Sequence, residues 1–276
     1  MSEYETDGMI LRIQFVRSGP PVWLAHLDIM HAFERGLRRA GLKLKYSQGF
    51  NPRPQLVFAL PLGVGVEAAA EIADAYLEGE VDEEGLAGRL TENLPMGLSV
   101  RQARLIGRDE AKHLMADVAA ALYRLEVKGL ADALATFHNA EEVIVPKYSK
   151  GKLRDINIKP LILATEPVVR TAPGEREAVR FLVKAGSHQN LRPDLIIDAA
   201  QAMGFISDHA HEAGRIHREA LYLREHHKNL DEGSVRLLDP YSLKPLDELP
   251  SRMDRWHEAS RFLAPELLNT GYDREQ

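Results

Sequence analysis

The chain has no cysteine and no long apolar run, and aromatic residues make up only 7% of it. The absence of cysteine excludes disulfides, thiolate catalysis and an iron–sulfur cluster held by cysteines of this chain. No stretch of about 18 consecutive apolar residues is present, so we expect no segment to span a membrane. The beginning of the chain is acidic and polar, unlike a secretory signal, and we therefore expect a cytoplasmic protein.

The net charge of −6 argues against a general nucleic-acid binder. The charges are unevenly spread, however. Eight Lys/Arg face two acids between Arg12 and Pro54, and five Lys/Arg face one acid between Lys147 and Lys159. The segment from Glu67 to Glu92 is the reverse, with nine acids and one arginine. Two basic segments in an acidic molecule indicate a cationic binding face, although a solvated helix face gives the same pattern.

The order of apolar patterns predicts an α+β fold made of two similar halves. The first half reads as strand Met9–Val16, helix Ala25–Ala40, strands Leu56–Leu62 and Glu71–Leu77, helix Asp82–Leu94 and strand Leu98–Ile106. The second reads as strand Ala120–Lys128, helix Leu130–Ala140, strands Leu153–Leu163 and Ala178–Lys184, helix Pro193–Gly204 and strand Glu219–Arg224. Each half has the β-α-β-β-α-β order, which predicts two tandem ferredoxin-like halves with antiparallel sheets.

These patterns place the halves at residues 9–107 and 116–225, followed by a polar tail at 226–276 with a short amphipathic helix. A pentapeptide recurs between the first helix and the second strand of each half, as Lys45-Tyr-Ser-Gln-Gly49 and Lys147-Tyr-Ser-Lys-Gly151. Its occurrence at equivalent positions favours related halves.

The loop from Tyr46 to Pro54 is the strongest candidate site. Its prolines fix φ and Gly49 permits a positive φ, so the loop is expected to be stiff. A stiff loop beside a basic helix could hold a phosphate or stack a base on Phe50. The alternative is a structural turn with Phe50 in the core. The predicted substrate-binding residues are Arg35, Arg38, Arg39, Lys45, Tyr46, Phe50, Asn51, Arg53, Lys152 and Arg154.

The segment Lys150–Pro160 predicts a cationic strand, with Arg154, Asn157 and Lys159 on one face and Ile156 and Ile158 on the other.

His26 and Asp28, at the start of the first helix, are the acid–base candidates. Asp28 could instead accept first-turn N–H groups. We expect no metal site, because the histidines of the second half lack the spacing of a metal-binding set: His209, His211, His217, His226 and His227.

Four segments, in order, resemble the radical-SAM-linked protein family (the DUF2344 type): His26-Leu-Asp28, Phe33-Glu-Arg-Gly-Leu-Arg-Arg-Ala-Gly-Leu42, Tyr46-Ser-Gln-Gly-Phe-Asn-Pro52 and Phe58-Ala-Leu-Pro-Leu-Gly-Val-Gly-Val66. Such domains lie beside or are fused to a cobalamin-binding radical SAM protein. The resemblance implies a partner that uses S-adenosylmethionine, an iron–sulfur cluster and cobalamin, while this chain carries no cofactor. Family members usually have His at Arg53 and Lys at Gln55, and this departure suits binding better than acid–base chemistry.

Without cysteine this chain cannot hold the cluster of a radical SAM enzyme. The resemblance therefore implies a non-catalytic companion of a radical SAM protein. The two basic segments suit RNA, such as tRNA or ribosomal RNA, as the substrate it presents. The alternatives are a stand-alone RNA-processing or RNA-modifying enzyme that uses His26 and Asp28, and a protein–protein scaffold.

Overall fold

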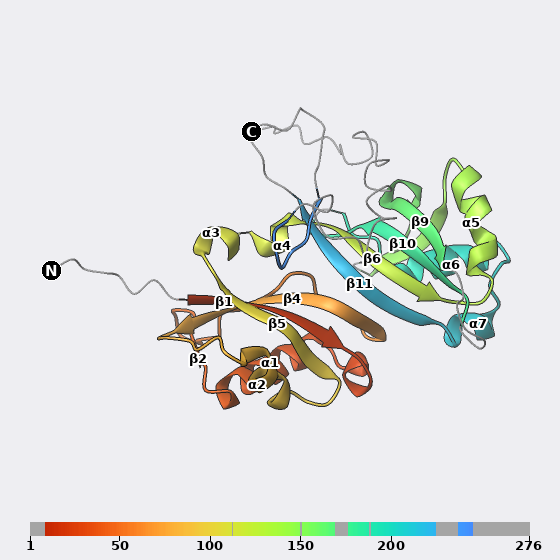
Figure 1. Ribbon diagram of the computed structural model, residues 1–276. Helices are drawn as coiled ribbons and strands as arrows, with labels where there is room; N and C mark the ends of the chain where they lie inside the picture. Colours follow the sequence, from red (N-terminus) through yellow and green to blue (C-terminus); the bar gives the residue numbers. More distant parts are fainter. Residues whose placement is uncertain are drawn as a thin grey trace, which may run out of the picture. The chain divides into compact units, whose positions relative to one another are not determined.

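The computed structural model describes residues 9–111, 113–149, 151–168, 176–187, 189–224 and 237–244. The chain forms two compact units, Met1–Val118 and Ala119–Gln276. Each combines helices with antiparallel strand pairs, which confirms the α+β class (Figure 1). The amphipathic helix predicted within the tail lies outside the described residues.

Three long strands form the sheet of the first unit: β1 (Met9–Arg17), β4 (Val66–Glu78) and β5 (Leu98–Ile106). Strand β1 lies in the middle and pairs antiparallel with both neighbours. Two short strands, β2 (Lys43–Leu44) and β3 (Leu56–Phe58), pair with the other edge of β4. The chain therefore returns to the sheet twice between the first helix and β4.

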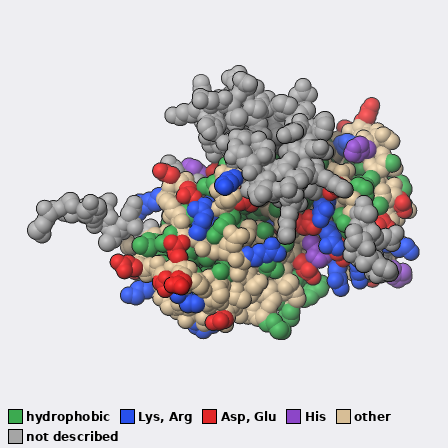
Figure 2. All heavy atoms as spheres, in the orientation of Figure 1, with side chains coloured by type: hydrophobic (Ala, Val, Ile, Leu, Met, Phe, Trp, Pro, Cys, Tyr) green, Lys and Arg blue, Asp and Glu red, His purple; other side chains and the backbone are tan. Residues whose placement is uncertain are grey.

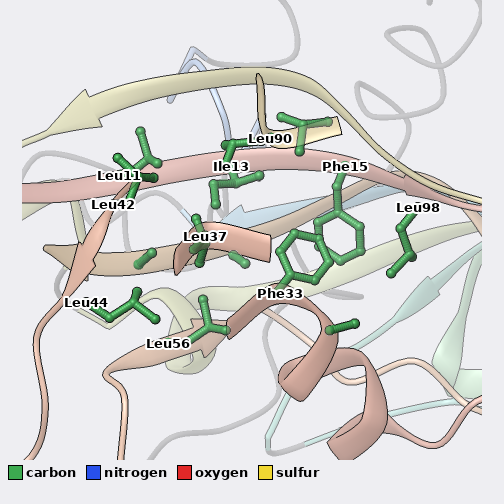
Figure 3. Close-up of a cluster of buried hydrophobic side chains, with 14 of the residues drawn as sticks. Leu11, Ile13, Phe15, Phe33, Leu37, Leu42, Leu44, Leu56, Leu90 and Leu98 are labelled. Atoms are coloured by element: carbon green, nitrogen blue, oxygen red, sulfur yellow. The ribbon is translucent and has the colours of Figure 1, made fainter. Parts of the chain in front are cut away.

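Helices α1 (His26–Arg39) and α2 (Leu86–Glu92) cover one face of this sheet (Figure 1). The buried residues of α1 recur at three- and four-residue steps, which gives the helix one apolar stripe. Three aromatic rings lie at the centre of the core, with centroid distances of 4.6 Å for Phe15–Phe33, 5.7 Å for Phe15–Phe58 and 5.5 Å for Phe33–Phe58. Figure 3 shows the rings of Phe15 and Phe33 among leucines of the strands and helices.

Along β1, Leu11, Ile13 and Phe15 alternate with Ile10, Arg12 and Gln14, and this pattern predicts a strand with only one buried face. The second face is nevertheless buried at Ile10 and Arg12. A short helix, α3 (Arg108–Ala111), contributes Ala111 to a cluster with Ile10 and Ile106 on that face. Arg12 lies there fully buried and donates to Asp74, with 2.8 Å from Nε to Oδ1 and 2.7 Å from Nη2 to Oδ2. It also donates to the Glu110 carbonyl of α3, at 2.9 Å. Arg12 and Asp74 thus form an ion pair inside the first unit.

Side chains satisfy backbone groups along the outer edge of β5. The Val100 N–H donates to Thr91 Oγ1 at 2.9 Å, and the Leu105 N–H donates to Glu83 Oε2 at 3.0 Å. Both acceptors precede β5 in the chain, one of them in α2. The strand that ends the sheet therefore has side-chain partners on its open side.

Arg17, at the end of β1, joins two later segments of the chain through hydrogen bonds. Its Nη2 donates to the carbonyls of Val22, in the 3₁₀ turn η1 (Pro20–Trp23), and of Gly63, at 3.1 Å. The Ser18 N–H donates to the Gly97 carbonyl at 2.8 Å. One buried guanidinium thus orders the approach to α1 and the turn before β4.

The second unit has the strand order β11-β6-β10-β9, made of β6 (Val118–Glu126), β9 (Ile162–Val168), β10 (Ala178–Lys184) and β11 (Arg215–Arg224). Its helices are α5 (Leu130–Asn139), α6 (Pro193–Ala202) and the short α7 (Asp208–Glu212), while α4 (Leu114–Asp117) precedes β6. Phe137 of α5 meets Phe181 of β10 edge to face, at 6.3 Å. Strand β12 (Leu237–Leu238) pairs with β11.

The single strand predicted at Leu153–Leu163 is wrong. The chain forms β8 (Lys152–Asn157), then the 3₁₀ turn η2 (Lys159–Leu161), then β9. Pro160 removes a backbone donor inside the predicted strand, which favours the break. Lys159 Nζ donates to the carbonyls of Phe137 and, at 2.9 Å, His138 at the end of α5, so it stabilises that helix end.

Candidate nucleic-acid interface

Residues 45–55 form a hairpin on the outer edge of β4, called here the first hairpin. Its arms are joined by Gln55 N–H to Lys45 carbonyl, at 2.8 Å, and by Ser47 N–H to Arg53 carbonyl, also at 2.8 Å. Ser47 Oγ additionally accepts from the Arg53 N–H at 3.0 Å. The Lys45 N–H donates to the Tyr76 carbonyl, and the Tyr76 N–H donates to the Gln55 carbonyl, so both arms are anchored to β4. These hydrogen bonds join the two arms to each other and to β4.

Phe50 lies at the tip of the first hairpin and is fully exposed, with a relative exposure of 111%. Gly49 next to it has φ of 131°, which lets the chain turn there. The neighbouring side chains of Gln48, Asn51 and Arg53 are exposed as well. The alternative with Phe50 in the core is therefore wrong, because the ring projects into solvent.

The predicted cations around the first hairpin fall into two groups. Arg38 donates to Glu34 and to the Tyr46 hydroxyl, with its guanidinium carbon 5.8 Å from the centroid of the Tyr46 ring. Arg39 donates to the Asn93 carbonyl just after α2. These two arginines thus connect α1 to its neighbours. By contrast, the side chains of Arg35, Lys45 and Arg53 have no ion pair among the described residues.

Residues 144–157 form the second hairpin, from β7 (Ile144–Ser149) and β8, and within the described residues these strands pair only with each other. The register places Lys147 opposite Arg154, Tyr148 opposite Leu153 and Ser149 opposite Lys152. Tyr148 and Leu153 are 70% and 66% exposed. An aromatic and a leucine side chain thus share one solvent-facing side of the hairpin, and three cations, Lys147, Lys152 and Arg154, share the other.

The register also corrects the predicted faces of this segment. Arg154 is two residues from Ile156 and therefore shares its face, whereas Asn157 lies on the other one. Asn157 Oδ1 accepts from the N–H groups of Val143 and Lys159, each at 3.0 Å. Asn157 and Lys159 thus hold the base of the hairpin, and Lys152 and Arg154 remain as its exposed cations.

The repeated pentapeptide forms the same element in both units. Lys45-Tyr-Ser and Lys147-Tyr-Ser are each the rising arm of a hairpin that turns at a glycine of positive φ. In the first hairpin Arg53 lies opposite Ser47 of this arm, and in the second Arg154 lies opposite Lys147. The sequence predicted the repeat, but only the register reveals that Leu153 stands beside Tyr148.

No broad field of one charge covers the surface seen in Figure 2. On the part of that face not drawn in grey, Lys and Arg side chains alternate with Asp and Glu. This agrees with a chain whose net charge is −6. On this face, an anion would therefore be held by local groups and not by a broad positive field.

The structure does not bring His26 and Asp28 together. The His26 ring is half-buried and meets Phe58 edge to face at 5.2 Å, while Asp28 is exposed on α1. Residue Ala25 is the N-cap and no side-chain hydrogen bond caps the helix, so the predicted capping role of Asp28 is wrong. Burial, and secondly the positive charge of Arg17, lower the pKa of His26. The imidazole is therefore neutral at neutral pH.

This lowered pKa leads to a pH-dependent prediction. His26 binds a proton less readily in the folded chain than in the unfolded one. Its contribution to stability is therefore lost as the pH falls from its unfolded pKa through its lower folded pKa. Replacing His26 by glutamine should remove that loss, so the variant's stability relative to the parent should rise on acidification. Urea unfolding of both proteins across this range measures the effect. A constant difference between them would contradict it.

No group of three or more His, Asp or Glu side chains suited to a metal ion occurs among the described residues. In the same part of the chain, none of the helices is long and apolar enough to cross a membrane.

One comparison with known proteins, the match to a family model, agrees with the DUF2344 resemblance in the sequence. No curated protein matches the chain. Among solved structures, an unknown protein from Galdieria sulphuraria is similar at 14% identity, over 76% of this chain and 96% of that one, with a TM-score of 0.22. That likeness is too low to carry an argument. A family model described as an uncharacterized protein conserved in bacteria (DUF2344) matches residues 11–193, and the chain belongs to this family.

Proposed function

We propose that this chain binds RNA through its two hairpins, as a non-catalytic companion that presents the RNA to a radical SAM protein. One observation carries the RNA part. Each hairpin places an exposed aromatic ring, Phe50 or Tyr148, within a few residues of exposed cations that have no ion pair among the described residues. Aromatic faces bind bases and cations bind phosphates, which is the combination that proteins use for RNA strands.

The companion role rests on different support. The resemblance in sequence links the family to radical SAM proteins, and this chain has no cysteine to hold their cluster. The acid–base pair that a stand-alone enzyme would need is not assembled, since Asp28 is exposed and His26 lies against Phe58. The chemistry would therefore belong to the partner, with S-adenosylmethionine and cobalamin bound there.

We also propose that each unit is a ferredoxin-like fold. Counted within the first unit, with β2 and β3 as one interrupted second strand, the strand order is fourth-first-third-second. The order β11-β6-β10-β9 in the second unit has the same form, with the second hairpin inserted before its second strand. Both units then have the β-α-β-β-α-β order of the ferredoxin-like fold.

Charge reversal in the second hairpin tests the RNA part. Replacing both Lys147 and Arg154 by glutamate should weaken RNA binding about tenfold or more near 0.1 M salt, because phosphate contacts are lost. The slope of log affinity against log salt should fall by about 2. Fluorescence anisotropy with tRNA at several salt concentrations measures both quantities.

The matched control reverses two exposed cations outside the hairpins, Arg101 and Lys128, and so makes the same change in net charge. Equal weakening by both double variants would show that only overall charge matters, and would contradict a hairpin interface. Affinity purification of the tagged chain, with bound proteins and RNA identified, tests the companion part. Recovery of a partner protein without RNA would favour the scaffold alternative. Turnover of RNA by the chain alone, abolished by His26→Ala, would favour the enzyme alternative.

A further inference from the structure

The hairpins carry more apolar surface than phosphate binding requires. Phe50 is fully exposed, and Tyr148 and Leu153 lie side by side on an exposed face. Exposed rings cost solvation free energy in the unbound protein unless a partner covers them. The rim of a paired RNA helix offers phosphates and 2′-hydroxyls but no free base faces, so these rings would gain nothing from a duplex.

Unpaired bases do offer such faces. A base stacks well on an aromatic ring, and this contact tolerates any base identity because every base has a π-face. Phe50 at the hairpin tip has no side chain packed over it, so its ring is free for contact. Tyr148 has Leu153 beside it, and this pair provides a flat apolar surface that can take one base.

The charges on the second hairpin favour the same type of ligand. Lys147 and Arg154 lie directly opposite each other, and like charges at such positions repel. Neither has an acidic partner among the described residues, and the acid nearest in the strand, Asp155, lies on the other face. A phosphate between the two cations would remove the repulsion. An RNA strand could place a phosphate against Lys147 and Arg154 and a base against Tyr148. It would then contact both faces of the second hairpin.

We infer that the two hairpins select unpaired RNA, with one base stacked on Phe50 and another on Tyr148 and Leu153. This inference rests on the proposed function, since it names the form of RNA that the same hairpins take. Unpaired bases can be splayed out and stacked on aromatic side chains, which the paired bases of a helix do not permit.

The test uses the full chain and a labelled RNA strand of about 16 nucleotides that does not pair with itself, alone and annealed to its complement. The single strand should bind about tenfold more tightly than the duplex. The variant with both Phe50→Ala and Tyr148→Ala should lose about tenfold or more in affinity for the single strand, and less than about twofold for the duplex. The variant with Phe50→Trp and Tyr148→Phe keeps both rings and should bind like the parent.

The control is Trp23→Ala, which removes an aromatic side chain that is 72% exposed but lies outside the hairpins. It should leave both affinities unchanged. Duplex binding as tight as single-strand binding, or equal losses in all alanine variants, would overturn the inference while leaving RNA binding in place. Failure of both RNAs to bind would instead overturn the proposed function, and stable capture of a protein that depends on Phe50 would assign the rings to a protein partner.

Discussion

Replacing Arg12 by methionine is expected to lower the free energy of unfolding of the first unit by about 3–5 kcal/mol, because it leaves Asp74 as an unpaired buried charge. Both side chains are almost completely buried, and two hydrogen bonds of 2.8 and 2.7 Å join them. The Glu110 carbonyl would lose a donor as well. Burial raises the pKa of Asp74, and the bonds and charge of Arg12 oppose that rise. Chemical denaturation followed by circular dichroism measures the loss.

Two further variants test whether the loss of stability comes from the unpaired charge of Asp74. A chain with both Arg12→Met and Asp74→Leu should recover most of the lost stability, since no charge is then left buried. Arg101→Met, which removes an exposed arginine from the neighbouring strand β5, should change stability by less than about 0.5 kcal/mol. If Arg12→Met alone were as mild as Arg101→Met, the ion pair would not be internal. The deficit of Arg12→Met should also shrink on acidification, as Asp74 takes up a proton and loses its charge.

Replacing Gly97 by alanine is expected to cost the first unit about 3 kcal/mol. Gly97 has φ of 93°, a conformation that costs a residue with a side chain about 1–2 kcal/mol. A Cβ at this position would also fall well within 3.0 Å of the Ser18 carbonyl oxygen and 2.7 Å from Pro21 Cδ. The backbones would have to separate, which breaks the bond from Ser18 N–H to the Gly97 carbonyl. The midpoint of urea unfolding measures this loss.

Gly41→Ala separates the two causes. Gly41 has a similar φ of 85°, but nothing lies within 4 Å of a Cβ built there. This variant should therefore show only the conformational cost of about 1–2 kcal/mol. Equal losses of stability in the two variants would mean that the contact of the new methyl group with Ser18 and Pro21 adds nothing to the loss in Gly97→Ala.

Much of the fold follows from local patterns in the sequence. Strands β5 and β10 have the predicted bounds. Elements β1 and α5 differ from prediction by one residue at one end, and α1 differs by one residue at each end. Short strands were harder to predict, because β2 has only two residues and β7 contains Pro146, which weakens a strand pattern. Pro146 lies opposite Asp155 in a hairpin with no further strand among the described residues, where its missing N–H is tolerated.

The site was partly predictable for a related reason. Proline, glycine and asparagine identified the first hairpin as a stiff turn, and the repeat indicated the second. The exposure of Phe50 could not be predicted, because an apolar residue in a loop packs inward or outward according to the tertiary surroundings. The burial of Arg12 was missed for the same reason. Its strand alternates as a half-exposed strand does, and only α3 and Asp74 make its second face internal.

The side chains along β5 have a consequence for how molecules of this protein meet. An open sheet edge is a template on which a strand of another molecule can add, and this is a common start of aggregation. Here Thr91 and Glu83 already hold the N–H groups of Val100 and Leu105, so an incoming strand would have to displace both before it could pair. The sheet edge of the first unit is therefore protected against edge-to-edge growth by two side chains of its own chain.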